Sequence, residues 1–334
     1  MTFLRPRRAS QRAVDLRILP CRSTTVHGED QPLTPAATTF TLGANDPGRP
    51  ALTVDRMGLG AMRLPGAGMS YDRDATPVDR SGSIAVLRRA LELGVNHIDT
   101  AAFYFSPSRS ANELINTALA PYPEDLLIAT KVGPGRHFDG DGFAARPDQL
   151  RGQVEENLRQ LGRDHLDLVY LRRMRQESIT EHFAALAELR EAGMFRHLGV
   201  SNASLAHLAE AQQIAPVVAV ENRFNLEVRV HEDVLHACTE QGIAFVPYYA
   251  LAGEGREAGY EARAGVASLD QAVAEVAERH DATPAQIRLA WTLHLGPNVL
   301  AIPGTSSVEH LEENVAAAAL ELSSEDLALL EADR

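Results

Sequence analysis

The stretch LLIATKV, residues 126–132, decides how the fold is interpreted, because it is a short apolar run without alternation. Such a run is typical of a strand that is buried on both faces, as in a parallel sheet. The segments on either side of it, 110–119 and 147–161, carry apolar side chains at helical spacing. A buried strand between two helices is the repeating unit of α/β proteins with parallel strands.

The same unit repeats along the chain from residue 57 onward. We predict strands at 57–62, 95–99, 126–132, 166–171, 197–201, 217–221, 243–248 and 299–302. We predict helices around 84–91 and at 110–119, 147–161, 179–191, 205–213, 232–241, 269–280 and 284–294, with short helices from Val308 and Glu325. Eight such units predict a closed (β/α)8 TIM barrel. The alternative is an open doubly wound sheet, but no G-x-G-x-x-G fingerprint follows a predicted strand.

The N-terminal part of the chain differs in pattern from the rest. Residues 39–42 and 51–54 are short β-prone runs on either side of the turn signal NDPG, residues 45–48, and they predict a β-hairpin. Residues 1–38 mix Arg, Ser, Thr and Pro without periodicity, so we expect an extension without fixed structure. Residues 39–334 are then one barrel domain that begins with the hairpin.

Composition narrows the class of protein. The formal net charge is −13, which argues against general nucleic-acid binding because such binding needs a basic surface. The two cysteines form no disulfide framework, and no apolar run approaches the roughly 20 residues of a membrane helix. The pair Arg7-Arg8 could belong to a twin-arginine export signal. The residues that follow carry charges, however, and lack the apolar core of a signal peptide. We therefore expect a cytoplasmic protein that binds neither membranes nor nucleic acid.

Polar residues gather where the predicted strands end, which is where the active sites of such barrels lie. They are Asp99 with Tyr104 after it, Lys131, Arg172, Ser201-Asn202, Glu221, Tyr248, and Gly304-Thr305. Each one alone has a plain structural explanation, such as a helix cap, a packed ring or a solvated strand end. Their coincidence at one end of the barrel is what points to a site.

Lys131 is the only lysine in the chain; the other 31 basic residues are arginines. At the end of an apolar strand its ammonium would be partly buried and would need an anionic partner, for which Asp99 is available. A cation near Tyr104 favours the phenolate, so we expect a lowered pKa for Tyr104 and a role in proton transfer. Arg172 could donate hydrogen bonds to a carbonyl oxygen on which negative charge develops.

Several spaced motifs together resemble the aldo-keto reductase family. They are Gly58-x-Gly60-x-Met62, His97-Ile98-Asp99-Thr100-Ala101 with Tyr104, the strand ending in Lys131, Gly199-Val200-Ser201-Asn202, and Ile302-Pro303-Gly304-Thr305 with Glu313-Asn314. The likeness covers residues 40–334. It implies a (β/α)8 barrel that reduces aldehydes to alcohols with NADPH and has no Rossmann domain.

The resemblance also implies roles for individual residues. The catalytic set would be Asp99, Tyr104, Lys131 and Arg172. The cofactor-binding set would be Gly60, Met62, Ser201, Asn202, Glu221, Tyr248, Gly304, Thr305, Ser306, Ser307, His310, Glu313 and Asn314. Within it, Ser201 and Asn202 would hold the nicotinamide carboxamide, and the ring of Tyr248 would stack on the nicotinamide. The segment from Gly304 to Asn314 would take the adenosine phosphate end.

The chain departs from the family pattern at three positions. Arg172 stands where His is usual, Glu221 where Gln is common, and His310 where an Arg often binds the ribose phosphate. The last change leaves NADH as an alternative to NADPH, although a helix N-terminus with two serines can still bind a phosphate. Tyr170-Leu171-Arg172, together with Val246-Pro247-Tyr248 and the stretch from Pro303 to His310, resembles a subgroup of the family that includes bacterial pyridoxal reductases. The competing interpretation is that Arg172 turns outward toward a surface acid.

Two other function classes stay open on the sequence. The chain could be a cofactor-bound regulatory or binding protein on the same barrel, or a lyase that uses Lys131 as a Schiff base. A metal centre is not expected, because no second histidine pair ends a strand beside His97-x-Asp99. The expected partner is a small carbonyl substrate, and the sequence leaves the oligomeric state undecided.

Overall fold

The computed structural model describes residues 38–66, 78–106, 108–136, 142–251 and 266–332. Residues Pro35–Arg334 form one compact unit. The extension expected over residues 1–38 lies outside the described part except for its last residue. Its lack of fixed structure, and the domain boundary after it, therefore stay predictions.

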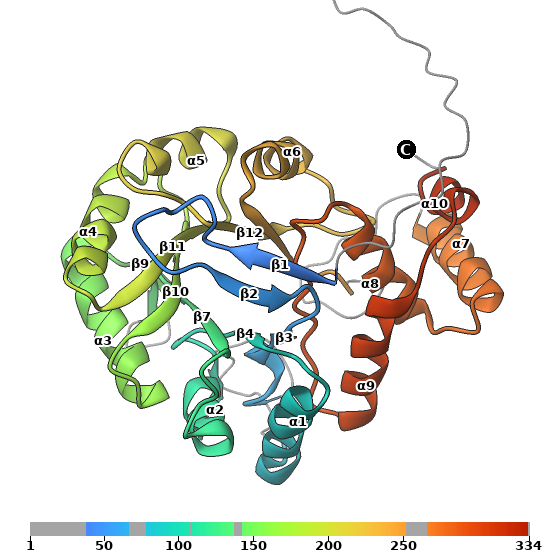
Figure 1. The fold of residues 1–334 in the computed structure, drawn as a ribbon, viewed down its shortest axis with the longest axis horizontal. Coiled ribbons are helices and arrows are strands. Elements are labelled where there is room, and N and C mark those ends of the chain that lie inside the picture. Colours follow the sequence, from blue (N-terminus) through green and yellow to red (C-terminus); the bar gives the residue numbers. More distant parts are fainter. Residues whose placement is uncertain (1–37, 67–77, 107, 137–141, 252–265, 333–334) are drawn as a thin grey trace, which may run out of the picture. The chain divides into compact units, whose positions relative to one another are not determined.

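A parallel sheet of seven strands forms the wall of the barrel (Figure 1). In chain order the strands are β3 (Leu59–Gly60), β4 (His97–Asp99), β7 (Leu127–Val132), β10 (Leu166–Arg172), β11 (Phe195–Ser201), β12 (Ala219–Arg223) and β13 (Ala244–Tyr248). All six residues of β7 are buried, which is why the strand is apolar along its whole length. The strands occur where the sequence pattern predicts them.

The eighth position of the barrel is filled by an irregular segment, residues 298–304. Leu300 N donates to Phe245 O at 2.9 Å, and Ala301 N donates to Arg56 O at 2.8 Å. Isolated parallel bridges therefore link this segment to β13 on one side and to the start of β3 on the other. Pro303, within this segment, accepts from Gly60 N through its carbonyl oxygen but has no N–H to donate in return, which weakens the ladder. The barrel closes as predicted, but its eighth strand is not a regular one.

The helices surround the strands (Figure 1). They are α1 (Arg80–Glu92), α2 (Ala111–Leu119), α3 (Leu150–Leu161), α4 (Thr180–Glu191), α5 (Leu205–Gln212), α6 (Glu232–Gln241), α7 (Val266–Arg279), α8 (Pro284–His294), α9 (Val308–Ala316) and α10 (Ser324–Leu330). Helix α8 begins at the capping box expected from the sequence, in which Thr283 N donates to Gln286 Oε1 at 2.9 Å. Short 3-10 helices lie at Ala61–Arg63, Pro147–Gln149 and Ala317–Ala319.

Three antiparallel hairpins accompany the barrel. The predicted N-terminal one pairs β1 (Thr39–Leu42) with β2 (Leu52–Asp55). Two further hairpins, β5 (Phe105–Ser106) with β6 (Arg109–Ser110) and β8 (Pro134–Arg136) with β9 (Gly142–Ala144), were not predicted. Both follow strands on the side of the barrel where the polar residues gather.

The N-terminal hairpin covers the opposite end of the barrel (Figure 1). Its Leu42 and Val54 are buried and belong to the same apolar cluster as Leu127 and Leu168, which lie near the starts of their strands. One end of the barrel is therefore closed by apolar side chains. The polar residues of the predicted site lie at the other end, where the strands finish.

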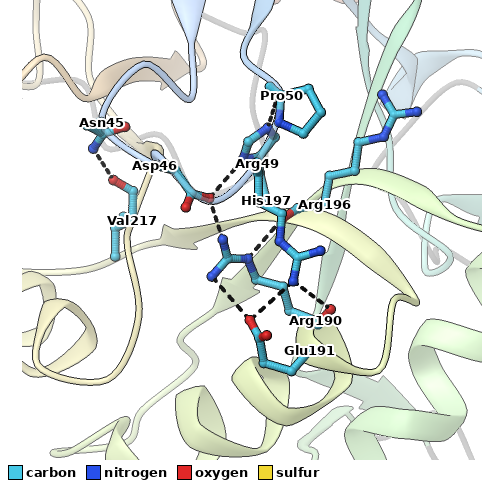
Figure 2. Close-up of polar contacts among 9 residues, drawn as sticks. All are labelled: Asn45, Asp46, Arg49, Pro50, Arg190, Glu191, Arg196, His197 and Val217. Atoms are coloured by element: carbon cyan, nitrogen blue, oxygen red, sulfur yellow. Dashed lines mark hydrogen bonds and ion pairs between the residues drawn. The ribbon is translucent and has the colours of Figure 1, made fainter.

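Buried charges fix the loop of this hairpin to the barrel (Figure 2). The Asp46 carboxylate accepts a hydrogen bond from Arg190 Nη2 at 2.5 Å and lies 3.2 Å from His197 Nδ1. The other ring nitrogen of His197 lies 2.9 Å from the carbonyl oxygen of Pro50. A Cβ at Gly43, whose φ is +84°, would come within 2.7 Å of the His197 ring, so the loop needs glycine there.

Candidate active site

The barrel brings the predicted catalytic residues to one end, because parallel strands in register end together. Tyr170 is paired with Lys131 in neighbouring strands, and Arg172 is paired with Ser201. Ser201 is paired in turn with Glu221 on the next strand. The polar residues at the strand ends therefore form a ring around the open mouth of the barrel.

The predicted ion pair between Lys131 and Asp99 is present. Lys131 Nζ donates to Asp99 Oδ1 and, at 3.2 Å, to the backbone oxygen of Thr100. The Lys131 side chain is 0% exposed and that of Asp99 is 5% exposed. A lysine this deeply buried keeps its charge only because carboxylates surround it, and these carboxylates raise its pKa against the opposing effect of burial.

A second carboxylate also faces Lys131, which the sequence reasoning missed. Glu221 Oε2 lies 3.3 Å from Lys131 Nζ, and the Glu221 side chain is 2% exposed. The sequence does carry a signal for this contact. A carboxylate at the end of an apolar strand needs a cation, and Lys131 is the chain's only lysine.

Tyr104 lies against the same ammonium. Lys131 Nζ is 5.0 Å from the centre of the Tyr104 ring, and the residue is 9% exposed. Burial raises the Tyr104 pKa well above its usual value; Lys131 opposes this, while Asp99 and Glu221 add to it. The expectation of a lowered Tyr104 pKa is therefore wrong, because desolvation outweighs the nearby cation. The phenol holds its proton across the neutral range, which suits a proton donor.

Tyr170 also borders the buried lysine, and the sequence reasoning missed it. Its ring centre is 6.0 Å from Lys131 Nζ, and burial raises its pKa well above the usual value. The ring lies over Gly199, where a Cβ would come within 2.5 Å of Tyr170 Cδ1. Gly199 is thus required by the packing of this ring, which no local sequence signal reveals.

Arg172 points toward the mouth of the barrel. Its Nη1 donates to Ser201 Oγ at 3.2 Å, and its guanidinium carbon lies 5.0 Å from the centre of the Tyr248 ring. The alternative of an outward Arg172 paired with a surface acid is therefore wrong. The guanidinium stands between the buried Ser201 hydroxyl and the half-buried Tyr248 side chain, to which it also hydrogen-bonds, and its fork carries five N–H donors.

The residues predicted to bind a cofactor fall into two groups. Ser201, Asn202, Glu221 and Tyr248 lie at the ends of β11 to β13. The second group begins beside Gly60, whose N–H donates to Pro303 O at 3.1 Å, and runs through residues 304–307 into α9. A Cβ at Gly60 would lie 2.5 Å from Ile302 O, so this close approach requires glycine.

Helix α9 begins with the serines expected to bind phosphate. Ser307 Oγ accepts from His310 N at 3.3 Å, and Thr305 Oγ1 accepts from Ser307 N at 3.0 Å. His310 is exposed, whereas Asn314 is buried. Met62, near Gly60, is half-buried. These contacts position the segment, and the binding roles of its residues stay predictions.

The described residues contain neither a cluster of metal ligands nor a membrane-spanning helix. Among them, no group of three or more His, Cys, Asp or Glu side chains could hold a metal ion. His97, the histidine nearest the site, is buried, which lowers its pKa to about 4 and leaves the ring neutral. No helix within the described ranges is long and apolar enough to cross a membrane.

Comparison with known sequences gives matches over most of the chain. The model of the aldo/keto reductase family matches residues 56–333. Pyridoxine 4-dehydrogenase of Escherichia coli is 41% identical over 287 residues, which cover 84% of this chain and 94% of the relative. An uncharacterised oxidoreductase of Schizosaccharomyces pombe is 41% identical over 280 residues, covering 83% of this chain and 86% of the relative.

Solved structures that are similar to this chain include members of the same family. An aldo/keto reductase from Klebsiella pneumoniae in complex with NADP and acetate has a TM-score of 0.69 at 26% identity, and the match covers 88% of this chain and 94% of that one. A thermostable aldo-keto reductase in complex with the inhibitor epalrestat has a TM-score of 0.71 at 31% identity, covering 88% and 98% of the two chains.

Proposed function

The chain belongs to the aldo/keto reductase family, and we propose that it is an NADPH-dependent reductase of small aldehydes, with pyridoxal as the leading candidate substrate. The observation that carries the proposal is the buried Lys131–Asp99 pair beside the ring of Tyr104. A protonated phenol held against a buried ammonium is a donor matched to a carbonyl oxygen on which negative charge develops.

The residues at the mouth of the barrel fit a nicotinamide dinucleotide. The end of β11 supplies the buried Ser201 hydroxyl, which accepts from Arg172, and the half-buried Asn202, whose Nδ2 donates to Arg173 O and whose side-chain oxygen could accept from a carboxamide. Tyr248 offers a half-buried ring for stacking. The start of α9, with Ser306 and Ser307, offers donors to a phosphate. Two solved structures of aldo-keto reductase from Klebsiella pneumoniae are complexes with NADP or NADPH, which supports the same cofactor here.

The chemistry of the reduction divides between cofactor and protein. The cofactor, when bound, supplies the hydride that reaches the carbonyl carbon. Tyr104 donates its phenolic proton to the carbonyl oxygen, and the positive charge of Lys131 stabilises the tyrosinate left behind. Asp99 keeps Lys131 protonated and in place. Arg172 donates to the same carbonyl oxygen as charge builds on it.

Pyridoxal suits this arrangement because of Arg172. Its aldehyde stands beside an ionisable ring hydroxyl, so two oxygens face the same direction. A planar guanidinium can donate to both together, whereas a neutral imidazole has only one N–H. The Escherichia coli relative is named pyridoxine 4-dehydrogenase, and pyridoxine is the alcohol that reduction of pyridoxal would give, which supports this choice of substrate.

Loss of NADPH absorbance with pyridoxal, with pyridoxal phosphate and with plain aldehydes tests the proposal. We expect turnover of pyridoxal that falls by about 10²-fold or more in Tyr104→Phe, because the general acid is removed while the ring stays. Phe103→Leu, which changes the neighbouring ring, is the control for packing and should retain turnover. Turnover of plain aldehydes alone would remove pyridoxal from the proposal. Tight NADPH binding without oxidation by any carbonyl would favour a binding protein instead.

A further inference from the structure

Glu221 reaches Lys131 from across the barrel. Lys131 lies on β7 and Glu221 on β12, and two strands, β10 and β11, separate them in the sheet. The 3.3 Å contact between Glu221 Oε2 and Lys131 Nζ therefore spans the interior rather than following a strand pair. Asp99 contacts the same ammonium from the adjacent β4, so one lysine has two buried carboxylates.

When both carboxylates are ionised, the two of them around one ammonium leave a net negative charge in the interior. An uncompensated buried charge is costly, so a second cation is needed nearby. Arg172 is that cation: its Nη1 donates to Ser201 Oγ at 3.2 Å, Ser201 is the strand partner of Glu221, and against the lowering by burial the charge of Glu221 helps to raise the Arg172 pKa. With Arg172 counted, the two acids and two bases cancel.

We propose that Glu221 is a positioning residue that acts as the second counter-ion of Lys131, and that Arg172 balances its charge. Two of the three departures from the family pattern, Arg172 and Glu221, would then belong together as one compensated change. The resemblance placed Glu221 in the cofactor-binding set, and this inference gives it a different task. It deepens the proposed function, but its main test needs no turnover.

The titration of the cluster depends on every charged or ionisable group that faces it. These groups are His97 and Asp99 on β4, Tyr104 after it, Lys131 on β7, Tyr170 and Arg172 on β10, Glu221 on β12 and Tyr248 on β13. The pKa of Asp99 is raised to about 7 in total: burial and the charge of Glu221 raise it, while Lys131 and Arg172 lower it. Removing the charge of Glu221 should therefore lower the midpoint of the Asp99 titration, and removing the charge of Arg172 should raise it.

Because Lys131 is the only lysine, labelling the full chain with ¹³C-lysine gives one reporter signal inside the cluster. Its Cε resonance should follow the protonation of Asp99, with a midpoint near 7 in the wild type. In Glu221→Gln we expect the midpoint to fall by on the order of one pH unit, and in Arg172→Gln to rise by a similar amount. Glu227→Gln, a buried acid that pairs with Arg288 instead, is the control and should leave the midpoint unchanged.

An unchanged midpoint in Glu221→Gln, or shifts of the same sign in both variants, would overturn the inference. NADP⁺ binding measured in the same samples separates the two roles of Glu221. A tenfold or greater loss of affinity without a titration shift would make Glu221 a cofactor contact, as first predicted. If Glu221→Gln does not fold, Glu221→Asp, which withdraws the carboxylate from Lys131 by one methylene, should lower the midpoint, and an unchanged midpoint there would overturn the inference. Absence of carbonyl turnover in the wild type would affect the proposed function alone.

Discussion

Lys131 shows at the residue scale why one basic residue cannot replace another. Its side chain is fully buried between Asp99 and Glu221, where a compact ammonium fits and a planar guanidinium does not. We expect Lys131→Arg to lower kcat by about 10²-fold or more, because the charge is displaced from the Tyr104 ring. Steady-state kinetics with NADPH and an aldehyde check this. Arg151→Lys, the opposite exchange at an exposed pair with Glu155, should leave kcat unchanged.

Some of the site could be predicted at this scale and some could not. The pairing of Lys131 with Asp99 follows from a lysine at the end of an apolar strand, which must find an anion. The high pKa of Tyr104 does not follow, because it depends on how completely the fold buries the ring. Tyr170 was missed because its place depends on Gly199, which is distant in sequence and adjacent only in the sheet.

At the scale of elements, the N-terminal hairpin is held by charge as well as by apolar packing. The side chains of Asp46 and Arg190 are 2% and 6% exposed, so neither charge can be left to water. We expect Asp46→Asn to lower the free energy of unfolding by about 3–5 kcal/mol, because the Arg190 charge stays buried without its partner. Urea unfolding measures the change, and an unchanged m value would show that the midpoint shift reports stability.

A matched control lies in the same loop. Arg49 pairs with Glu191 at 3.2 Å, but the Glu191 side chain is 71% exposed, and Arg49→Gln should cost only about 0–1 kcal/mol. Equal losses in the two variants would mean that burial of the Asp46 pair contributes nothing. Because the hairpin covers the end of the barrel opposite the site, kcat of folded Asp46→Asn should match the wild type.

For the whole molecule, periodicity predicted the order of strands and helices, because each repeat must bury an apolar strand between helices. Periodicity could not predict how the barrel closes. The sequence predicts a strand at residues 299–302, yet only isolated bridges join this segment to β13 and to the region of β3. The small hairpins after β4 and β7 were missed for a related reason, since their pairing depends on loops rather than on a repeating apolar pattern.

The interior of the barrel also makes the stability of the whole molecule depend on pH. His97 is buried beside Gly58, where a Cβ would come within 2.1 Å of the ring, and burial lowers its pKa to about 4. In the unfolded chain a histidine titrates near 6.5, so between about pH 6.5 and 4 the unfolded state binds a proton that the folded state refuses. The contribution of neutral His97 is therefore full above pH 6.5 and is lost as the pH falls toward 4.

We expect the free energy of unfolding to fall between pH 7.5 and 4.5 by about 2–3 kcal/mol more in the wild type than in His97→Gln, which has no titrating ring. Comparing the two proteins at each pH removes the contributions of other groups, including Asp99, whose raised pKa acts in the opposite direction. Urea unfolding at the two pH values measures the difference. Parallel losses in both proteins would mean that the folded barrel accepts a proton at His97, and that the interior is less closed to water than its packing indicates.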